Sequence, residues 1–369
     1  MTVPPGVGII GAGNVLPAYL QVLDRLVPRG LAREGPICAR RKEKWPELLR
    51  RRPGAQLVAD AQEVVEADVD VVVVLTPPDS HAELTRLALE HGKHVVVEKP
   101  FAESREEGEA LARLAAERGL HLLAAPFVQL SPTLRAFWTI VGDGALGHVH
   151  SARALYGNAG SHWTTWYHSG GPGPLGEAGI YNLKSLTALL GRVVEVLAAE
   201  AVAVETREVR GVEIARPDPD VSHIILRHAG GALSSVVSSQ AIQRYRRPAL
   251  ELYGTEGTAN LLGDDWDPRG FEDWRNAVGT WEEHDAIEPT WLGADGLREV
   301  VVSIRDGRPP LASLEHDLHL LDVVAAARES VANCAPVPVD SSFAALDLRL
   351  ELPSRIEHVH DHTRPSDEQ

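Results

Sequence analysis

A lysine that directly follows a buried strand is the first residue in this chain whose position suggests chemistry. Lys99 comes after the apolar run Val95–Val97 and lies between Glu98 and Pro100. The β-branched run is typical of a buried strand, and Pro100 disfavours the α-helical conformation for Lys99 and stiffens the turn. A lysine at the start of a loop is often only solvated. At the carboxyl edge of a parallel sheet, where open α/β folds bind ligands, Lys99 would be placed for catalysis.

A second candidate pair lies where a glycine-rich stretch leads into a helix. Residues 170–176 read GGPGPLG, and the helix that follows is predicted to stop at Gly191. If this helix has begun by Glu177, then Glu177 and Tyr181 are four residues apart and share one face near its N-terminus. A nearby ammonium would favour the ionised phenol, which suits Tyr181 to transfer a proton to or from a carbinol oxygen. The structural alternatives are an interface tyrosine bonded to backbone and a carboxylate that caps the helix.

The N-terminal residues have the order that a dinucleotide requires. The short apolar strand Val7–Ile10 runs into Gly11 and Gly13 and then into a helix over residues 17–26. Gly11 permits a tight turn, Gly13 lets the backbone approach the phosphates, and the free N–H groups of the helix point at the anion. Leu16 replaces the third glycine of the fingerprint, so a glycine turn without a ligand is the alternative interpretation.

The second predicted strand, over residues 36–39, bears on the choice of cofactor. It is followed by Arg40 and Arg41, where an acidic residue would hold the ribose 2′-hydroxyl of NAD. Arginines at this point are suited to the 2′-phosphate of NADP, so the sequence favours NADP over NAD. The alternative is that both arginines belong to the solvated start of a helix.

Apolar runs and helical patterns alternate as far as residue 125. Further strands are expected at 71–75, 93–97 and 120–124, with helical patterns between them. Repeated β-α-β units predict an α/β Rossmann domain with a doubly wound parallel sheet over residues 1–125. In such a sheet Lys99 and the Gly11 turn lie at the same edge.

The pattern changes from residue 126. Ser131 and Pro132 begin a helix, and the later strands come in neighbouring pairs. These strands are expected at 148–156, 193–206, 222–228, 232–240, 248–253 and 258–262. Short turns between adjacent strands predict a large, mainly antiparallel, open-faced sheet in an α+β domain for substrate binding and oligomerisation, over residues 126–369. The stretch Trp266–Trp291 lacks clean periodicity, and we interpret it as an irregular excursion that forms a lid or an oligomer contact.

The composition limits the partners of the chain. Thirty-six basic and 52 acidic side chains give a net charge of −16, which disfavours nucleic acid and anionic membrane surfaces. There is no apolar run of about eighteen residues, and the first residues do not read as a signal peptide, so we expect a cytoplasmic protein without a membrane span. Cys38 and Cys334 are the two cysteines, and neither a disulfide framework nor a thiolate metal site is expected from them.

Aromatic residues make up only 5% of the chain, yet they crowd residues 162–168. Indole faces suit the apolar faces of a sugar ring, and imidazoles can hydrogen-bond its hydroxyls. The predicted substrate-binding residues are therefore His162, Trp163, Trp166 and His168, and the predicted ligand is a carbohydrate or cyclic polyol. The alternative is that the tryptophans pack the domain interface. The two histidines do not have the spacing of a metal site, and we expect no metal.

Taken together, these motifs resemble the glucose-fructose oxidoreductase / inositol dehydrogenase / MocA (Gfo/Idh/MocA) family of nicotinamide-dependent oxidoreductases. The resemblance covers most of the chain. It rests on the order and spacing of GAGN at 11–14, TPPDSHAEL at 76–84, EKP at 98–100, GGPGPLGEAGIYNL at 170–183 and YGTEGTANL at 253–261. It implies that Lys99 orients the reacting oxygen. The cofactor contacts that it implies come from the same motifs, at Gly11, Gly13, Asn14, Val15, Thr76, Pro77, His81, Glu98 and Lys99, beside Arg40 and Arg41.

This chain departs from the family pattern in its second catalytic stretch. The family usually places an acid/base histidine in a DxGxHxxD setting, where this chain has Glu177, Tyr181 and Lys184 in place of the first aspartate, the histidine and the last aspartate. This departure is similar to the glucose-fructose oxidoreductase and dihydrodiol dehydrogenase branches, in which a tyrosine fills the histidine position. It argues against transferring the specificity of inositol dehydrogenase.

We therefore predict an NAD(P)-dependent oxidoreductase, a dehydrogenase or reductase that acts on CH–OH groups. A hydride would move between nicotinamide C4 and a carbon of a sugar, polyol or related carbonyl, while Lys99 polarises the oxygen, Tyr181 relays the proton and Glu177 assists. The alternatives are an NAD-dependent glycosidase-type enzyme with transient oxidation and a non-catalytic dinucleotide sensor. The open sheet face and the resemblance both suggest a homodimer or homotetramer.

The first prediction concerns Lys99. Substituting Lys99→Ala should remove most of the turnover, because the oxygen of the substrate loses the charge that polarises it, while NADP(H) still binds. Steady-state rates and a cofactor titration on the same preparation measure both quantities. A variant with a near-wild-type rate would end the assignment.

Overall fold

The first domain is built on a parallel sheet. The computed structural model describes residues 3–350 except 163, 216 and 247. Its first six strands are β1 (Gly6–Ile10), β2 (Arg33–Cys38), β3 (Leu57–Val58), β4 (Val71–Val74), β5 (His94–Val97) and β6 (Leu122–Ala124). They lie in the order β3-β2-β1-β4-β5-β6, and every neighbouring pair is parallel. This order confirms the doubly wound sheet. The sequence order of the strands runs one way from β1 to β3 and the other way from β4 to β6, and folds of this type bind ligands where the order reverses.

The strands of this sheet read as continuous apolar runs because both faces are covered. Val71 and Val73 of β4 pack into the cluster that contains α1, whereas Val72 and Val74 pack into the cluster on the opposite face. Alternate residues of a strand point to opposite faces, so a strand buried on both sides needs no polar residue. The helices that accompany these strands are α1 (Leu16–Leu26), α2 (Trp45–Arg51), α3 (Ala61–Val65), α4 (His81–Glu90) and α5 (Arg105–Glu117).

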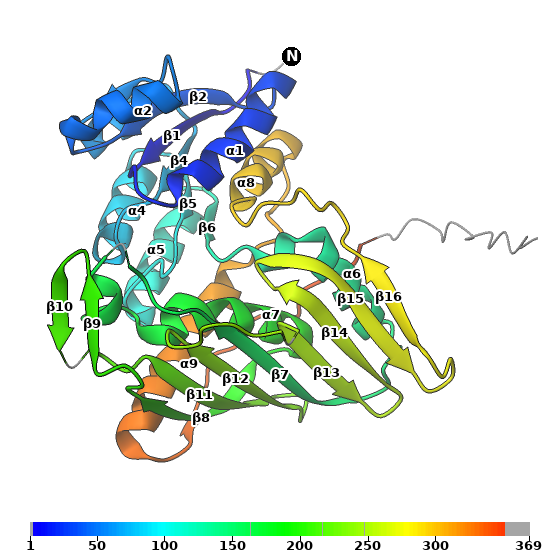
Figure 1. Ribbon diagram of the computed structural model, residues 1–369. Coiled ribbons are helices and arrows are strands. Elements are labelled where there is room, and N and C mark those ends of the chain that lie inside the picture. The colour runs from blue at the N-terminus through cyan, green and yellow to red at the C-terminus, as the bar shows by residue number, and fades with distance from the viewer. Residues whose placement is uncertain (1–2, 163, 216, 247, 351–369) are drawn as a thin grey trace, which may run out of the picture.

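One helix from late in the chain returns to the first domain. Helix α8 (Gly296–Asp306) places Leu297, Val300 and Val301 in the same apolar cluster as α1, and Figure 1 shows the two helices side by side. The sequence analysis did not predict this helix, although Leu297, Val300, Val301 and Ile304 recur at helical spacing. The domain boundary at residue 125 stays a prediction. Helix α8 follows this boundary in the sequence but packs on the first domain.

The second domain is built on a large mixed sheet. Its strand order is β16-β15-β14-β13-β7-β12-β11-β8-β17, and all neighbouring pairs are antiparallel except β7 with β12. The strands are β7 (Val149–Gly157), β8 (Val193–Ala201), β11 (Val221–His228), β12 (Leu233–Ser239), β13 (Leu250–Gly254), β14 (Gly257–Asp264), β15 (Asp267–Arg275), β16 (Trp281–Asp285) and β17 (Val337–Pro338). A separate hairpin pairs β9 (Thr206–Val209) with β10 (Val212–Ala215).

Two expectations about this sheet are corrected. The stretch Trp266–Trp291, interpreted as an irregular excursion, instead forms β15 and β16, which extend the sheet beyond β14 in antiparallel register. The strand expected over 193–206 ends at Ala201, and residue 206 begins the separate hairpin. The carboxylate of Asp220 explains the early end, because it accepts hydrogen bonds from the backbone N–H groups of Ala203 and Val204 and so removes them from the ladder.

One face of the large sheet is covered and the other is open. Helices α6 (Pro132–Gly142), α7 (Ile180–Leu190) and α9 (Leu314–Asn333) pack on the covered face, and Figure 1 shows α7 between this sheet and the first domain. The open face includes Leu197, Ile225 and Leu233, which are 39%, 51% and 42% exposed. The predicted open-faced sheet is therefore confirmed, whereas the oligomeric state stays a prediction. Among the described residues, none of the helices combines the length and the apolar character that crossing a bilayer requires.

A buried ion pair holds α7, the helix that carries Tyr181, against α9. The ammonium of Lys184 on α7 donates to the carboxylate of Asp317 on α9, and both side chains are almost fully removed from water. Burial raises the pKa of Asp317 to about 6, and the Lys184 ammonium limits this rise. Thr187, one turn further along α7, contacts the ring of His316 through its hydroxyl. These polar contacts form only when α7 lies in one position against α9, so they fix the packing of the two helices.

This pair leads to a stability prediction. Substituting Lys184→Met leaves the Asp317 carboxylate buried without its partner, and we expect the free energy of unfolding to fall by about 3–5 kcal/mol. Denaturant unfolding at pH 7 measures the change. The double variant Lys184→Met/Asp317→Leu removes both charges and should recover most of the loss. Equal destabilisation in the single and double variants would contradict the role given to the ion pair.

Candidate active site

The two catalytic candidates Lys99 and Glu177 are brought together from different domains. Lys99 follows β5, and its Nζ lies 2.8 Å from Oε1 of Glu177 and 2.9 Å from the backbone oxygen of the same residue. Only 10% and 17% of the two side chains are exposed. Glu177 lies in the π-helical turn η6 (Leu175–Gly179) that precedes α7. Burial raises the pKa of Glu177, and the Lys99 ammonium partly opposes this rise.

Tyr181 lies next to this ion pair, as the sequence predicts. Nζ of Lys99 is 5.8 Å from the centre of the Tyr181 ring, which comes one turn after Glu177. The expectation that the ammonium favours the ionised phenol is wrong, however. Burial raises the pKa of Tyr181 well above its usual value, and the carboxylates of Glu98, Glu177 and Asp265 raise it further. Tyr181 is therefore a neutral phenol at pH 7, and a neutral phenol can donate its proton.

Glu98 is held by a tyrosine that sequence reasoning missed. The hydroxyl of Tyr19 on α1 donates to Oε1 of Glu98 at 2.9 Å, and Oε2 of Glu98 accepts from the backbone N–H of Lys99 at 3.3 Å. Burial raises the pKa of Tyr19 well above its usual value, and the Glu98 charge adds to the rise. A tyrosine on the buried stripe of a helix usually needs a partner for its hydroxyl, and this was the available signal.

His81 joins the two loops that border the site. Its Nδ1 lies 2.7 Å from the backbone oxygen of Pro100, and its Nε2 lies 2.7 Å from the backbone oxygen of Thr76. Carbonyl oxygens only accept, so both contacts are hydrogen bonds at once only when both ring nitrogens carry protons. The side chain is 1% exposed. The sequence placed His81 among the cofactor contacts, whereas its buried ring is arranged to hold the loops that present Thr76, Pro77 and Lys99.

The glycine turn of the first domain fits a dinucleotide phosphate. Gly11 has φ +111°, and a Cβ there would lie 2.7 Å from the backbone of Leu75, so the turn requires glycine. Gly13, Asn14 and Val15 are exposed, and a Cβ on Gly13 would meet nothing closer than 4.0 Å. Helix α1 begins here with no capping side chain and no acidic residue in its first turn. The N–H groups of Leu16 and Ala18 in its first turn donate to the backbone oxygens of Gly13 and Val15, and Pro17 has none, so the exposed backbone of the turn itself, at residues 13–15, is what an anion can approach.

The residues predicted to select the cofactor lie at the end of β2. Arg40 and Arg41 are exposed, and the described residues offer them neither an ion pair nor a side-chain hydrogen bond. Beside them, the Trp45 indole donates to the backbone oxygen of Ala39 at 2.8 Å, and the Lys42 ammonium lies over the Trp45 ring. Two unpaired guanidinium groups next to an aromatic ring suit an adenosine phosphate.

The two histidines of the aromatic stretch at 162–168 differ in exposure. His162 is exposed, whereas His168 is 2% exposed and its Nε2 contacts the backbone oxygen of Ser161 at 2.7 Å. The buried ring of His168 therefore contacts the backbone of its own loop from the protein interior. Trp163 lies outside the described residues, and for Trp166 only the backbone is described, as part of the short turn Trp166–His168.

Two further residues belong to the site although sequence reasoning did not select them. The ring of Tyr156, near the end of β7, is stacked on Tyr181 with centres 6.0 Å apart and an angle of 12°. Asp265 is fully buried, where Oδ2 accepts from the Asn182 amide and the Ser185 hydroxyl at 3.0 Å each. Burial raises the pKa of Asp265 to about 7. No pattern in the sequence joins these positions, because each contact spans more than twenty residues.

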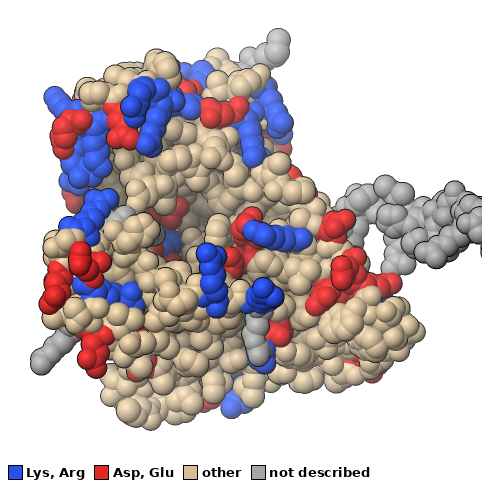
Figure 2. Space-filling view, in the orientation of Figure 1, with Lys and Arg blue, Asp and Glu red and all other residues tan. Residues whose placement is uncertain are grey.

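A cavity and a hollow lie between the domains. Figure 2 shows the hollow, with acidic and basic side chains at its floor. The cavity has a volume of about 880 Å³ and reaches Lys99. The first domain contributes Pro77 and Pro100 to its wall, and the second contributes Ile180 and residues 170–172. Lys99 is thus accessible at the junction of the two domains, where a small molecule can be enclosed.

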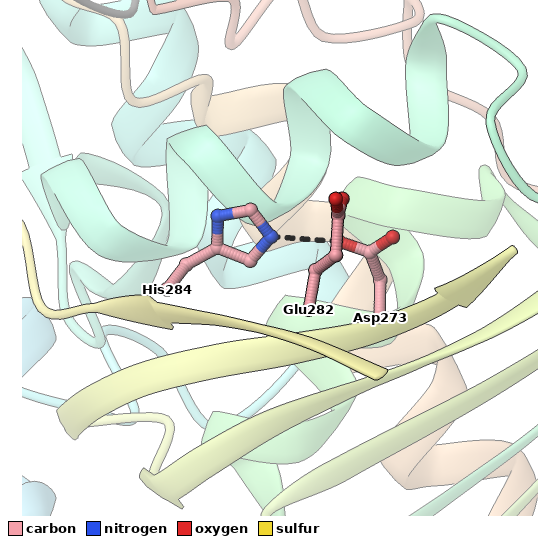
Figure 3. A group of neighbouring side chains, drawn as sticks. All are labelled: Asp273, Glu282 and His284. Atoms are coloured by element: carbon pink, nitrogen blue, oxygen red, sulfur yellow. Dashed lines mark hydrogen bonds and ion pairs between the residues drawn. The ribbon is translucent and has the colours of Figure 1, made fainter. Parts of the chain in front are cut away.

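One group of side chains in the described residues has the donor types of a metal site. Asp273, Glu282 and His284 lie together on β15 and β16 (Figure 3), with Nε2 of His284 2.7 Å from Oδ1 of Asp273. The guanidinium of Arg275 pairs with both carboxylates, at 2.7 Å from Asp273 and in closer contact with Glu282. Arg275 thus supplies positive charge to both carboxylates, and the four side chains join the two strands.

Two family matches cover the two domains. Residues 6–125 match the oxidoreductase family with an NAD-binding Rossmann fold, and residues 134–260 match the GFO/IDH/MocA C-terminal domain. The fold and the site define a two-domain nicotinamide-dependent oxidoreductase. Because the matches together span more than half of the chain, it belongs to the GFO/IDH/MocA family, as the sequence motifs predicted.

Individual relatives have low sequence identity to this chain. Trans-1,2-dihydrobenzene-1,2-diol dehydrogenase of Bos taurus is 27% identical over 265 residues, which cover 71% of this chain and 75% of the relative. Levoglucosan dehydrogenase of Pseudarthrobacter phenanthrenivorans is 26% identical over 280 residues, covering 66% and 71%. The solved structure of a levoglucosan dehydrogenase in complex with NADH has a TM-score of 0.79 at 20% identity and covers 92% of this chain and 100% of that one. At this identity the structural match supports the fold.

The geometry of His81 leads to a kinetic prediction. Substituting His81→Ala removes the link between the Thr76 and Pro100 carbonyls, and we expect kcat to fall about tenfold, the equivalent of one lost hydrogen bond. Because the ring does not reach the surface, the cofactor Kd should change by less than about twofold. Steady-state kinetics and a cofactor titration test this, with His91→Ala, at the exposed end of the same helix, as the control. A large loss of cofactor affinity with unchanged kcat would instead make His81 a cofactor contact.

Proposed function

We propose that this chain interconverts a hydroxyl and a carbonyl on a sugar or cyclic polyol, with Lys99 and Tyr181 acting on the oxygen that reacts. The observation that carries the proposal is the Lys99–Glu177 pair beside Tyr181, at the carboxyl edge of the sheet that also carries the Gly11 turn. A positive charge and a neutral phenol at one point stabilise an oxygen that gains negative charge.

The bound nicotinamide dinucleotide supplies or accepts the hydride. Lys99 donates a hydrogen bond from its ammonium to the substrate oxygen, and Glu177 keeps this ammonium aimed at the site through its side chain and its backbone oxygen. Tyr181 gives its proton to the oxygen when a carbonyl is reduced, because its raised pKa keeps the phenol protonated. When an alcohol is oxidised, the proton leaves through the same phenol. Because this phenol is already protonated, it passes its own proton on as it takes the proton of the alcohol, and the acceptor that we propose is Glu177, a carboxylate one turn earlier with a raised pKa.

For the cofactor we favour NADP over NAD. Arg40 and Arg41 are free of ion pairs within the described residues, and no carboxylate ends β2. A ribose 2′-phosphate supplies the charge that these guanidinium groups can pair with.

For the substrate we favour a ring that carries vicinal hydroxyls. The relatives named above are dehydrogenases of a cyclic dihydrodiol and of an anhydrosugar. The stacked rings of Tyr156 and Tyr181 give the site an aromatic wall that suits the apolar face of such a ring. His162 stays a predicted contact to substrate hydroxyls, as do Trp163 and Trp166, whereas the buried ring of His168 supports the loop that bears them.

The experiment that tests this function is Tyr181→Phe. The variant keeps the ring that stacks on Tyr156 but loses the proton, so we expect kcat to fall by about 10²–10⁴ with little change in cofactor affinity. Initial rates are measured with NADP⁺ and NAD⁺ on a panel of cyclic polyols, aldoses and anhydrosugars. Tyr253→Phe, whose hydroxyl contacts Glu251 on the outer side of the sheet, is the control.

Three outcomes would contradict the proposal. A Tyr181→Phe variant with a rate near that of the wild type would remove Tyr181 from the mechanism. A chain that binds the cofactor but oxidises nothing on the panel would behave as a sensor. Cleavage of a glycoside with no net change in the cofactor would indicate the glycosidase-type reaction.

A further inference from the structure

A second cavity lies beside the candidate active site, at one end of the large sheet. Its volume is about 630 Å³. Three segments line it: the end of β7 with the residues that follow, at 156–159; residues 243–246 after β12; and the turn between β14 and β15, within 263–269. None of the sequence motifs pointed to this cavity, because its walls come from three separate parts of the chain.

This cavity adjoins the reacting centre through one shared residue. Tyr156 lines the cavity and is also stacked on Tyr181, with ring centres 6.0 Å apart. The cavity therefore lies one aromatic ring away from Tyr181, and a substrate that reacts at Tyr181 would reach the cavity across Tyr156. Trp266, on the opposite wall, is 40% exposed and offers a second aromatic surface.

The walls are held in place by contacts between the segments. The hydroxyl of Tyr245 donates to the carboxylate of Asp264, which fastens residues 243–246 to the end of β14. Gly157 packs closely on Ile242, since a Cβ at Gly157 would lie 2.7 Å from that side chain. These contacts connect the three segments, so the cavity is part of the fold.

The charges on its lining are opposite in sign to those of the chain as a whole. The net charge of the chain is −16, yet three arginines and two aspartates line this cavity. Asp264 is engaged by Tyr245, and Asp267 lies 3.9 Å from Arg269. Arg244 and Arg246 are exposed, and within the described part of the chain no ion pair or hydrogen bond engages their side chains. Three arginines against two aspartates leave one positive charge in excess on the lining, and Arg244 and Arg246 are the guanidinium groups there that no described carboxylate pairs with.

We infer that this cavity is a subsite for an anionic group on the substrate, a carboxylate or a phosphate, which Arg244 and Arg246 bind. The planar guanidinium fork matches either anion with two parallel hydrogen bonds. Tyr156 and Trp266 cover the apolar faces of the intervening ring. The substrate is then an acidic or phosphorylated sugar, and its neutral parent binds less tightly. This inference rests on the proposed function, because it places the reacting carbon of the sugar at Tyr181.

Binding measurements test the subsite without relying on turnover. Calorimetric titrations of the NADP⁺-saturated protein use three sugars that differ at C6, namely glucose, glucuronate and glucose 6-phosphate, together with acetate and inorganic phosphate. We expect at least one anionic sugar to bind about tenfold or more tightly than glucose, with an affinity that falls as salt is added. The carboxylate and phosphate probes show which anion the site prefers.

Variants assign the effect to the two arginines. Arg244→Gln/Arg246→Gln should remove the advantage of the anionic sugar, while the affinities for glucose and NADP⁺ stay within about twofold. Arg153→Gln/Arg227→Gln makes the same change of charge on the outer face of the sheet, where both arginines are paired with glutamates, and should keep the advantage. This control separates a local contact from a general effect of net charge.

The outcomes separate the subsite from the proposed reaction. The subsite is overturned if no anionic probe binds more tightly than glucose, or if the Arg244/Arg246 variant binds the anions as the wild type does. In that case the proposed reaction would still be supported if the wild type turns over neutral polyols and the Tyr181→Phe variant does not. Conversely, tight binding of an anionic sugar through both arginines, with no oxidation of any sugar or polyol, would support the subsite and reject the reaction.

Discussion

The ion pair between Lys99 and Glu177 determines how the two domains meet at the site. Lys99 leaves the end of a parallel strand in one domain, and Glu177 lies in the π-helical turn that opens α7 in the other. Both side chains are mostly removed from water, so each charge depends on the other for the stabilisation that water would give. The pair therefore fixes the direction of the ammonium and the position of Tyr181 one turn further along the helix.

The charges around this pair decide the chemistry of Tyr181. Burial raises the pKa of the phenol most, and the carboxylates of Glu98, Glu177 and Asp265 raise it further, so the proton is retained. For a histidine the two effects would oppose each other, because carboxylates favour its charged form and burial disfavours it. A tyrosine in the position that the family usually gives to histidine thus supplies a neutral donor. Lys184 lies where the family pattern has a second aspartate, and it serves a different purpose, because it fixes α7 by pairing with Asp317.

The fold was largely predictable where one rule governed a whole segment. The valines of β4 and β5 are buried on both faces, so their apolar runs identified the parallel strands correctly. The rule failed on β15, where the buried positions include Asp273 as well as Phe271. Asp273 can face inward because Arg275 and His284 satisfy its charge. Such pairing removes the alternation of apolar and polar residues on which a strand prediction depends. Helix α8 was not predicted although its apolar residues recur at helical spacing. Its packing on α1 could not be predicted, since α1 is more than 250 residues away in the sequence.

The sequence by itself determined which groups are available and in what order. The glycine turn at 11–14, the lysine after β5 and the spacing of Glu177 and Tyr181 identified the family and predicted the site. Only the tertiary structure decided what state those groups are in. It made Tyr181 a neutral phenol, turned His81 into the link between two loops, and placed His168 under its own loop. The physical reason is that protonation and hydrogen bonding depend on distances of a few ångströms between residues far apart in the chain. Those distances exist only once the domains have packed.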